Sequence, residues 1–275
     1  MCLNSRVKLS VVVVTYNQES NIGRTLASVL PMVRVLGGEI VVVDSGSSDR
    51  TVEIARACGA SVFVEEWKGF AAQKNSAIAR ASGDWILSLD ADEEVTHELA
   101  ESIRAVVSGT NGAKESHGVT ESHAGYTVAR KNLFLGKWIR HGGFWPDRKL
   151  RLFRLGAGRA GLRPVHETIE VEGTVGALRG ALIHHAYPTL TDYIEHMNRY
   201  SSLGAGMAAA GSSGFSVANV VLRPMATFLY NYVFRLGFLD GAEGLLLHLY
   251  HAGYVSWKYA KRWEAAQGPE IAHRK

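Results

Sequence analysis

Residues 85–93, Trp-Ile-Leu-Ser-Leu-Asp-Ala-Asp-Glu, run from an apolar segment directly into carboxylates. A continuous apolar run is typical of a buried strand in a parallel sheet, and ligands collect beyond the carboxyl ends of such strands. Asp90 and Asp92 are one residue apart, so the stretch predicts that both side chains point the same way at the mouth of a cleft. Such a pair suits a divalent ion that bridges to substrate phosphates. The alternative is a capping or solvated turn, since acidic residues also favour the start of a helix.

Strand and helix patterns alternate on either side of this stretch. Apolar, β-branched runs predict strands at residues 8–14, 39–43, 60–64 and 85–89, and helical spacing predicts helices at 21–30, 51–58 and 70–80, with the first helix ending at Pro31. This alternation indicates parallel βαβ units in an α/β protein. Right-handed crossovers then place Thr15, Asp44 and Asp90 at the same edge of one sheet.

The second half of the chain is less regular. A helix at 96–107 precedes residues 108–124, which are rich in Gly, Ser, Thr and His and predict an exposed, flexible loop. Strand patterns resume at 126–135, 149–155, 169–171 and 181–185. We therefore expect one catalytic domain over residues 1–187 and a helical region over residues 188–275.

Composition limits the possible partners and location. The 275-residue chain is 47% apolar and 20% charged, which is typical of a globular protein. Its net charge of +4 permits a nucleotide or a membrane surface as partner, and we expect no nucleic acid partner. Cys2 and Cys58 form no disulfide framework. The short apolar run at 9–14 does not fit a signal peptide and no long uncharged apolar run follows, so a cytoplasmic location is expected.

The C-terminal third contains amphipathic, helix-compatible stretches at 190–210, 215–238 and 241–263. Aromatic and basic side chains interleave along them, a combination that suits a membrane interface. These residues are Tyr230, Tyr232, Phe234, Phe238, Tyr250, Tyr254, Trp257 and Tyr259 with Arg223, Arg235, Lys258, Lys261 and Arg262. We expect peripheral attachment to the inner face of the cytoplasmic membrane. Packing on the sheet domain or on another subunit is the alternative, so an oligomer stays open.

Three motifs in order carry a family resemblance: Val-Val-Val-Val-Thr-Tyr-Asn at 11–17, Val-Val-Val-Asp-Ser-Gly-Ser-Ser-Asp-Arg-Thr at 41–51, and Leu-Asp-Ala-Asp-Glu at 89–93. They resemble the family 2 glycosyltransferases with the GT-A fold. Residues 145–154, 165–167 and 192–196 resemble the lipopolysaccharide-core branch, which includes glucosyltransferases that extend the inner-core heptose. The resemblance implies a Rossmann-like mixed or parallel sheet with flanking helices, here followed by the C-terminal amphipathic helices.

The resemblance also implies a donor site for a nucleoside-diphosphate sugar. Asp44 corresponds to a carboxylate that contacts the base, and Lys74 lies near the diphosphate or the base. Asp92 corresponds to the ligand of Mg²⁺ or Mn²⁺, with Asp90 orienting the ribose or a metal-bound water. The segment that lines the base and ribose comprises Thr15, Tyr16, Asn17 and Glu19. Turn formation, helix capping or a solvated helix face are the alternatives for these residues.

Family enzymes of this type invert the anomeric carbon, which requires one carboxylate as general base on the acceptor hydroxyl. Glu167 is the first choice for this base. Asp147 is the runner-up, although a neighbouring Arg148 could hold it in an ion pair. His166 is a further candidate for the metal or the diphosphate, or a structural histidine. The expected acceptor-side residues are Trp145, Arg148 and Arg151, and the arginines could instead pack as amphipathic strand residues.

The resemblance thus implies transfer of a hexose, glucose among the candidates, to a hydroxyl of a lipopolysaccharide-core or lipid-linked saccharide. Three alternatives stay open: a polyprenyl-phosphate glycosyltransferase, a sugar-phosphate nucleotidyltransferase, and a binding module that has lost catalysis. The nucleotidyltransferase would favour a glycine-rich phosphate loop near the N-terminus, and residues 15–18, Thr-Tyr-Asn-Gln, do not form one.

Overall fold

The computed structural model describes residues 8–109, 123–161, 168–207 and 215–267. The chain divides into two compact units: unit 1 is Met1–Arg130 with Asp147–His184, and unit 2 is Lys131–Pro146 with His185–Lys275. The predicted domain boundary between residues 187 and 188 stays a prediction. Unit 2 differs from the predicted helical region because it also includes the internal segment Lys131–Pro146.

Four parallel strands build one half of the sheet in unit 1. They are β1 (Leu9–Thr15), β2 (Glu39–Asp44), β3 (Ser61–Val64) and β4 (Trp85–Asp90), in the order β3-β2-β1-β4. Thr15 pairs with Asp44, and Val14 pairs with Asp90. The predicted convergence of these strand ends at one edge of the sheet is therefore confirmed.

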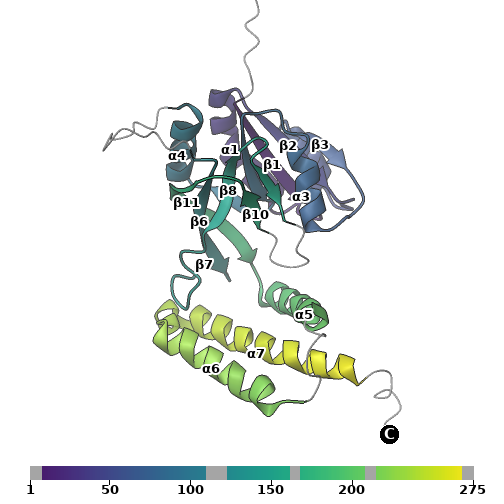
Figure 1. The fold of residues 1–275 in the computed structure, drawn as a ribbon, viewed down its shortest axis with the longest axis vertical. Coiled ribbons are helices and arrows are strands. Elements are labelled where there is room, and N and C mark those ends of the chain that lie inside the picture. The colour runs from purple at the N-terminus through teal and green to yellow at the C-terminus, as the bar shows by residue number, and fades with distance from the viewer. Residues whose placement is uncertain (1–7, 110–122, 162–167, 208–214, 268–275) are drawn as a thin grey trace, which may run out of the picture. The chain divides into compact units, whose positions relative to one another are not determined.

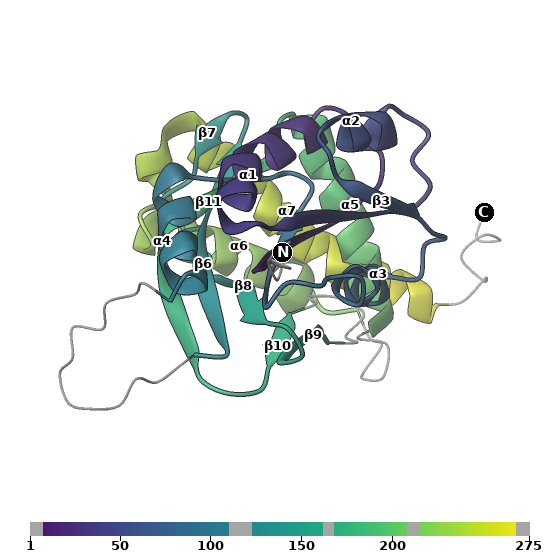
Figure 2. The same cartoon turned by 90° about the horizontal axis from the view of Figure 1, so that it is seen from above.

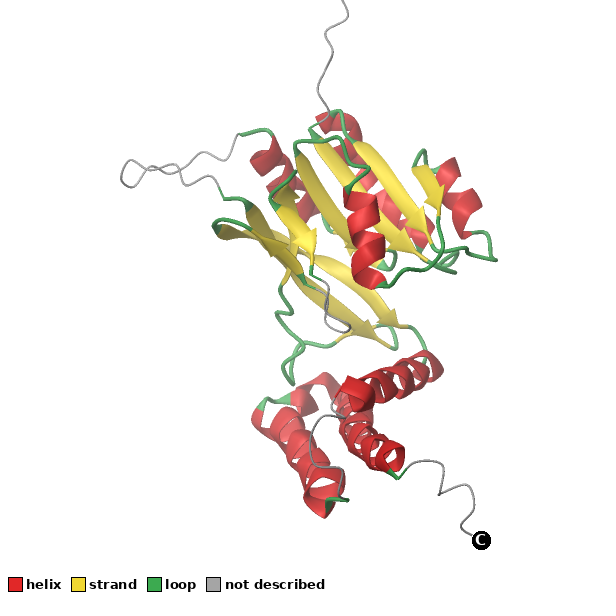
Figure 3. Cartoon of the chain, turned by 45° about the vertical axis from the view of Figure 1, so that its right-hand side comes forward, coloured by secondary structure: helices red, strands yellow, loops and turns green. Residues whose placement is uncertain are grey.

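The other strands make the sheet mixed. They are β8 (Lys149–Arg154), β6 (Gly125–Phe134), β11 (Val175–Tyr187) and β5 (Glu93–Val95), which continue the order from β4. The β4–β8, β8–β6 and β11–β5 pairs are antiparallel. Two short strands, β9 (Gly158–Ala160) and β10 (Ile169–Val171), form a separate antiparallel pair. Figure 3 shows the strands of unit 1 in yellow with red helices on both sides.

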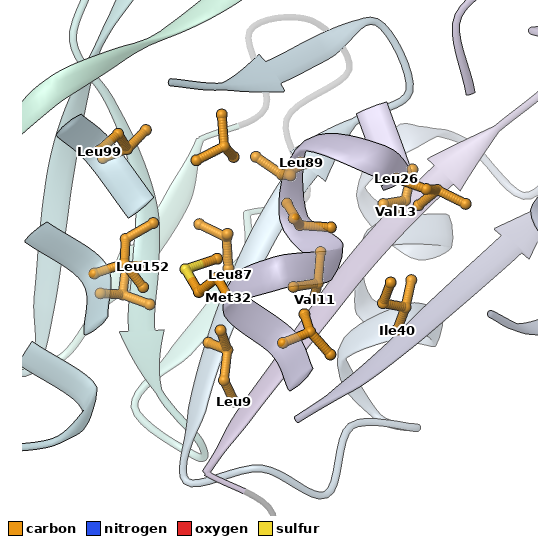
Figure 4. Packing of buried hydrophobic residues seen from close by; sticks show 14 of the residues in the cluster. Leu9, Val11, Val13, Leu26, Met32, Ile40, Leu87, Leu89, Leu99 and Leu152 are labelled. Atoms are coloured by element: carbon orange, nitrogen blue, oxygen red, sulfur yellow. The ribbon is translucent and has the colours of Figure 1, made fainter. Parts of the chain in front are cut away.

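Alternation along the strands sends side chains into two apolar layers. Leu9, Val11 and Val13 pack with helices α1 (Ile22–Leu36), α2 (Thr51–Ala57) and α4 (His97–Val107). Val12 points to the opposite face, where it packs with α3 (Phe70–Ile78) and the β9–β10 pair. Figures 1 and 2 show α1 and α3 on opposite sides of the strands, and Figure 4 shows the larger layer around Leu87 and Met32. The predicted sheet with flanking helices is confirmed.

Helix α1 corrects one expectation. It continues through Pro31 to Leu36 and ends at Gly37, whose φ of 61° lies in the left-handed region. Proline inside a helix removes one backbone hydrogen bond and normally kinks or ends the helix. Met32, Val33 and Leu36, beyond the proline, are buried in the core, and this apolar contact offsets the lost bond. The C-terminal glycine is the stop signal that this helix uses.

Unit 2 is mainly helical, as predicted. It contains α5 (Leu190–Met207), α7 (Gly241–Ala266) and, between them, the run η1 (Ala218–Leu222), α6 (Arg223–Leu229), η2 (Tyr230–Phe234) and η3 (Gly237–Asp240). Helix α7 packs against both α5 and α6. The core of unit 2 contains Phe134, Ile139, Tyr193, Met197 and Leu247. Among the helices of the described ranges, none combines the length and apolar character needed to cross a membrane.

Candidate active site

The carboxyl edge of the parallel strands carries the predicted donor residues, all within unit 1. The loop after β1 and the loop after β2 are joined by hydrogen bonds between their polar groups. The amide of Asn17 donates to Ser47 Oγ at 2.8 Å, and Asn17 Oδ1 accepts from the amide of Ser48 at 2.9 Å. Glu19 accepts from the amide of Arg50 at 3.1 Å. Asn17 and Glu19 therefore shape the edge, while the neighbouring Tyr16 is 56% exposed.

Thr15 and Asp44 differ in how their buried side chains are satisfied. Asp44 Oδ1 accepts from the amides of Gly46 and Ser47, and Ser47 Oγ donates to its Oδ2 at 2.5 Å. This carboxylate closes its own turn and does not cap α2, whose N-cap residue is Arg50. The contact with a base stays a prediction. Thr15 Oγ1 is buried without a hydrogen-bond partner in the part of the chain that the structure describes. A buried hydroxyl of this kind is normally paired with a protein group, an ordered water or a ligand.

Asp90 lies between two cations. Lys74 Nζ is 2.8 Å from Oδ1, and Arg151 Nη2 is 2.6 Å from Oδ2. Burial alone would raise the pKa of Asp90, but the charges of Arg151 and Lys74 hold this pKa well below its usual range. Asp90 is therefore ionised at neutral pH. Helix α3 brings the side chain of Lys74 directly to Asp90, and its contact with the diphosphate or the base stays a prediction.

Arg151, which the sequence placed on the acceptor side, lies beside Asp90 and Glu93. Its side chain is buried, and Nη2 also lies 2.5 Å from Glu93 Oε1. Burial would lower the pKa of Arg151, but Asp90 and Glu93 raise it above its ordinary value. Strand β8 pairs with β4, which brings Arg151 beside the carboxylates at the end of β4. The buried ion pairs hold the guanidinium at the end of β4, and a contact of Arg151 with an acceptor stays a prediction.

Glu93 was not expected at the site, yet it links two groups of charges. It is fully buried, accepts from the amide of Asp90 at 3.1 Å and lies 3.3 Å from Arg130 Nη1. Arg130 in turn donates to Asp147 Oδ2 from Nε and Nη2, at 3.0 and 2.6 Å. The only feature of the sequence that pointed to Glu93 was its position next to Asp92. Its partners Arg130 and Arg151 lie on strands that are distant in the sequence.

Asp147 is held in ion pairs, as one interpretation of the sequence expected. Its partners are Arg130 and Lys149, whereas the sequence suggested Arg148. Lys149 Nζ is 3.0 Å from Oδ1. Burial would raise the pKa of Asp147, but Arg130 and Lys149 lower it to about 2. A carboxylate with so low a pKa is a weak base at neutral pH.

Asp92 faces a histidine that sequence reasoning did not single out. His184 Nε2 lies 3.4 Å from Asp92 Oδ2, and both side chains are partly exposed. Burial would raise the pKa of Asp92, but His184 lowers it below its ordinary value. His184 reaches this position because β11 pairs with β5, with His184 opposite Glu93. The sequence signal was the His-His pair at the end of a predicted strand.

The Asp92–His184 pair fits a divalent ion in its chemistry. One carboxylate oxygen and one imidazole nitrogen are donors that Mn²⁺ accepts, and Mg²⁺ accepts the carboxylate. Within the described ranges, no cluster of three or more His, Cys, Asp and Glu side chains forms a ready metal site. Substrate phosphates and water are ligands that such an ion commonly adds to one or two protein groups.

Four further residues were predicted to belong to the site. Glu167 and His166 fall outside the described residues. Arg148 is exposed on unit 1. Trp145 belongs to unit 2, where its ring meets Trp138 edge-on with 5.0 Å between the ring centroids.

Removing the charge of Glu93 should destabilise unit 1 strongly. In Glu93→Gln, Arg151 and Arg130 lose a fully buried partner, and we expect a loss of about 3–5 kcal/mol in the free energy of unfolding. Glu101 is the matched control, since it pairs with Arg104 on the surface of α4, and Glu101→Gln should cost at most about 1 kcal/mol. Denaturant unfolding measures both values. Equal losses in the two variants would contradict the central position of Glu93.

Part of the chain matches a model of a known protein family. Residues 10–114 match the model of glycosyl transferase family 2. The chain is a glycosyltransferase with a family 2 domain. The matched segment contains Thr15, Asp44, Lys74, Asp90 and Asp92, whereas Arg130, Asp147, Arg151 and His184 lie beyond it.

Two relatives of this glycosyltransferase extend over most of its length. The lipopolysaccharide core biosynthesis glycosyltransferase LpsC of Rhizobium meliloti is 29% identical over 267 residues, which are 94% of this chain and 93% of that protein. An uncharacterized glycosyltransferase of Rickettsia typhi is 27% identical, covering 87% of this chain and 81% of that protein.

Among solved structures, residues 1–349 of S. aureus TarS align over 95% of this glycosyltransferase and 91% of that chain, with 17% identity and a TM-score of 0.43. Glucosyl-3-phosphoglycerate synthase from Mycobacterium tuberculosis, solved with Mn²⁺ and uridine diphosphate, aligns over 47% of this chain and 44% of that one. Its identity is 25% and its TM-score 0.33.

Proposed function

We propose that this enzyme transfers a hexose, with inversion, from a nucleoside-diphosphate sugar to a hydroxyl of a lipopolysaccharide-core or lipid-linked saccharide. The observation that carries the proposal is the arrangement at the end of β4. There, Asp92 faces His184 while Asp90 holds Lys74 and Arg151. The similarity to LpsC over nearly the whole chain supports the acceptor class.

The charges at this edge suit a leaving diphosphate. Lys74 Nζ, fixed at 2.8 Å from Asp90, supplies a positive charge where the diphosphate becomes more negative as the glycosidic bond breaks. A divalent ion held by Asp92 and His184 would supply Lewis-acid stabilisation of the same group. We assign Asp90 the role of positioning Lys74, because its two carboxylate oxygens are already taken by Lys74 and Arg151.

The general base is proposed to be Glu167. The base must accept the proton of the acceptor hydroxyl, and its strength falls with its pKa. Asp147 has a pKa of about 2 and is committed to Arg130 and Lys149. These contacts make Asp147 a poor base, and this supports Glu167 as the first choice.

Thermal unfolding in the presence of nucleotide sugars tests the donor class. With Mn²⁺ or Mg²⁺ present, one donor at about 100 times its Kd should stabilise the folded protein by about 2.7 kcal/mol, seen as a rise in Tm. The same donor should then be consumed only when a lipopolysaccharide-core or lipid-linked saccharide is added. Stabilisation by no nucleotide sugar with either metal would contradict the proposal. Consumption with a polyprenyl phosphate instead would keep the donor site and replace the acceptor class.

A further inference from the structure

The segment from Phe215 to Leu239 in unit 2 exposes an apolar surface of unusual extent, which we call the outer face. Side chains that are large, apolar and at least 44% exposed recur along it. They are Phe215, Val217, Val221, Leu222, Met225, Leu229, Tyr230, Val233, Phe234, Leu236, Phe238 and Leu239. Soluble proteins rarely leave a large contiguous apolar patch on their surface, and such patches mark sites of interaction.

The spacing of these residues places them on one side of the helical run. Val217, Val221, Met225, Leu229 and Val233 form one row at intervals of four, and Leu222, Ala226, Tyr230 and Phe234 form a second. Around an α-helix such a row would rotate by about 40° per step. The π-helical turns η1 and η2 make i→i+5 bonds and widen the turn, which counteracts this rotation. Members of both rows are exposed along the whole run, as one straight outer face requires.

The inner side of the same run carries its contacts to α7. Ser256 Oγ donates to the carbonyl of Val220 at 2.8 Å, and Arg223 donates to the hydroxyl of Tyr259. Figure 1 shows α6 lying alongside α7. Polar groups of the run, together with Tyr232, which meets the ring of His248, thus contact α7, while most of its large apolar side chains face outward.

The charge of the outer face selects its partner. Residues 215–239 contain two arginines, Arg223 and Arg235, and no lysine, aspartate or glutamate. The nearest acids along the chain are committed: Asp240 is buried against His141, and Glu243 pairs with Lys137. In a symmetric dimer through this face, each copy would present the same arginine, Arg235, to the other. An anionic lipid surface instead supplies apolar chains and the complementary charge.

We propose that the outer face lies in the interfacial layer of an anionic lipid bilayer, with Phe234 and its row neighbours inserted. Tyr230 favours this layer because its ring is amphipathic. Phe238 favours it because its ring is apolar and carries a partial positive charge along its edge. The inference deepens the proposed function by naming the surface that meets the lipid of the acceptor. It concerns attachment alone, so transfer to a water-soluble acceptor does not depend on it.

Point substitutions test this better than deletion of residues 241–275. That deletion would remove α7, which carries Leu247 of the core of unit 2, and lost binding could then reflect unfolding. The full-length double variant Leu229→Glu/Phe234→Glu should bind vesicles of phosphatidylcholine and phosphatidylglycerol at least tenfold more weakly than the wild type. Leu203→Glu is the matched control, because Leu203 is 46% exposed on α5 and Leu229 is 48% exposed. Binding of this control should stay within about twofold of the wild type.

Two further measurements separate the possible partners. Arg235→Ser should weaken binding about fivefold on anionic vesicles and leave binding to pure phosphatidylcholine unchanged. Wild-type protein that stays unbound, or a double variant that binds normally, would overturn the proposal. If the wild type is a dimer by light scattering and the double variant a folded monomer by circular dichroism, the face belongs to a second copy. If the wild type failed to transfer a sugar to a water-soluble acceptor, that result would instead count against the proposed function.

Discussion

Replacing Asp92 with asparagine should lower the rate of glycosyl transfer by at least about 100-fold, the effect of losing one charge-stabilising group in an active site. The substitution keeps the shape of the side chain and removes the charge that faces His184 at 3.4 Å. A divalent ion would lose its anionic ligand, and the leaving diphosphate would lose the stabilisation that the ion supplies. The measurement is the initial rate as a function of Mn²⁺ concentration, with the Tm recorded to confirm folding.

His184→Ala should give a weaker version of the same defect, with activity partly restored at higher Mn²⁺ concentration. Binding of Mn²⁺ in the presence of nucleoside diphosphate, followed by the paramagnetic resonance of the ion, should weaken in both variants. Glu101→Gln, on the surface of α4, serves as the control and should match the wild type. A fully active Asp92→Asn enzyme, or wild-type transfer that a chelator leaves unchanged, would remove the metal from the proposed mechanism.

Replacing Glu167 with glutamine should slow transfer by about 10²–10⁴-fold, the usual contribution of a general base. Donor binding, measured by thermal stabilisation, should be retained because the charge lost belongs to the acceptor side. Asp147→Asn should slow transfer less and should mainly lower stability, since Arg130 and Lys149 lose their partner. The two variants assayed in parallel decide between the two carboxylates.

The pH dependence of transfer gives an independent check on the same assignment. A base must be deprotonated, so the rate falls as the pH falls through its pKa. With the pKa of Asp147 at about 2, an Asp147 base would keep the rate flat down to about pH 3. We expect the rate to fall already at a pH above about 3 as the solution is acidified, and we expect this fall to be absent in Glu167→Gln. A flat profile together with an inactive Asp147→Asn would move the assignment to Asp147.

Local patterns in the sequence predicted the parallel half of the sheet. Apolar runs and polar strand ends are properties of neighbouring residues, so Thr15, Asp44 and Asp90 could be placed at one edge before any coordinates. The end of α1 was misplaced because a single proline was weighed without the buried Met32, Val33 and Leu36 that follow it. Burial across the core outweighed that local signal.

The partners of the two aspartates could not be predicted in the same way. Arg151 reaches Asp90 across 61 positions of sequence, and His184 reaches Asp92 across a still longer interval. Both arrive through antiparallel pairing onto β4 and β5, and strand order between distant segments has no local signature. The aromatic and basic composition of residues 215–238 indicated an interface, but the contacts to α7 were needed to show which side faces outward.

The π-helical turns around α6 change how such a surface can be recognised in other sequences. The usual test for an amphipathic helix sums hydrophobicity at 100° per residue. A stripe that repeats every four residues advances by 90° per residue. Over the 17 positions of Ala218–Phe234 the usual test therefore accumulates an error of about 160° and loses about a third of the signal. Scanning glycosyltransferase sequences at a period of four would reveal stripes that a standard helical wheel disperses. Met225 and Leu229 would then stand in one column with Val221 and Val233, as they do on the outer face.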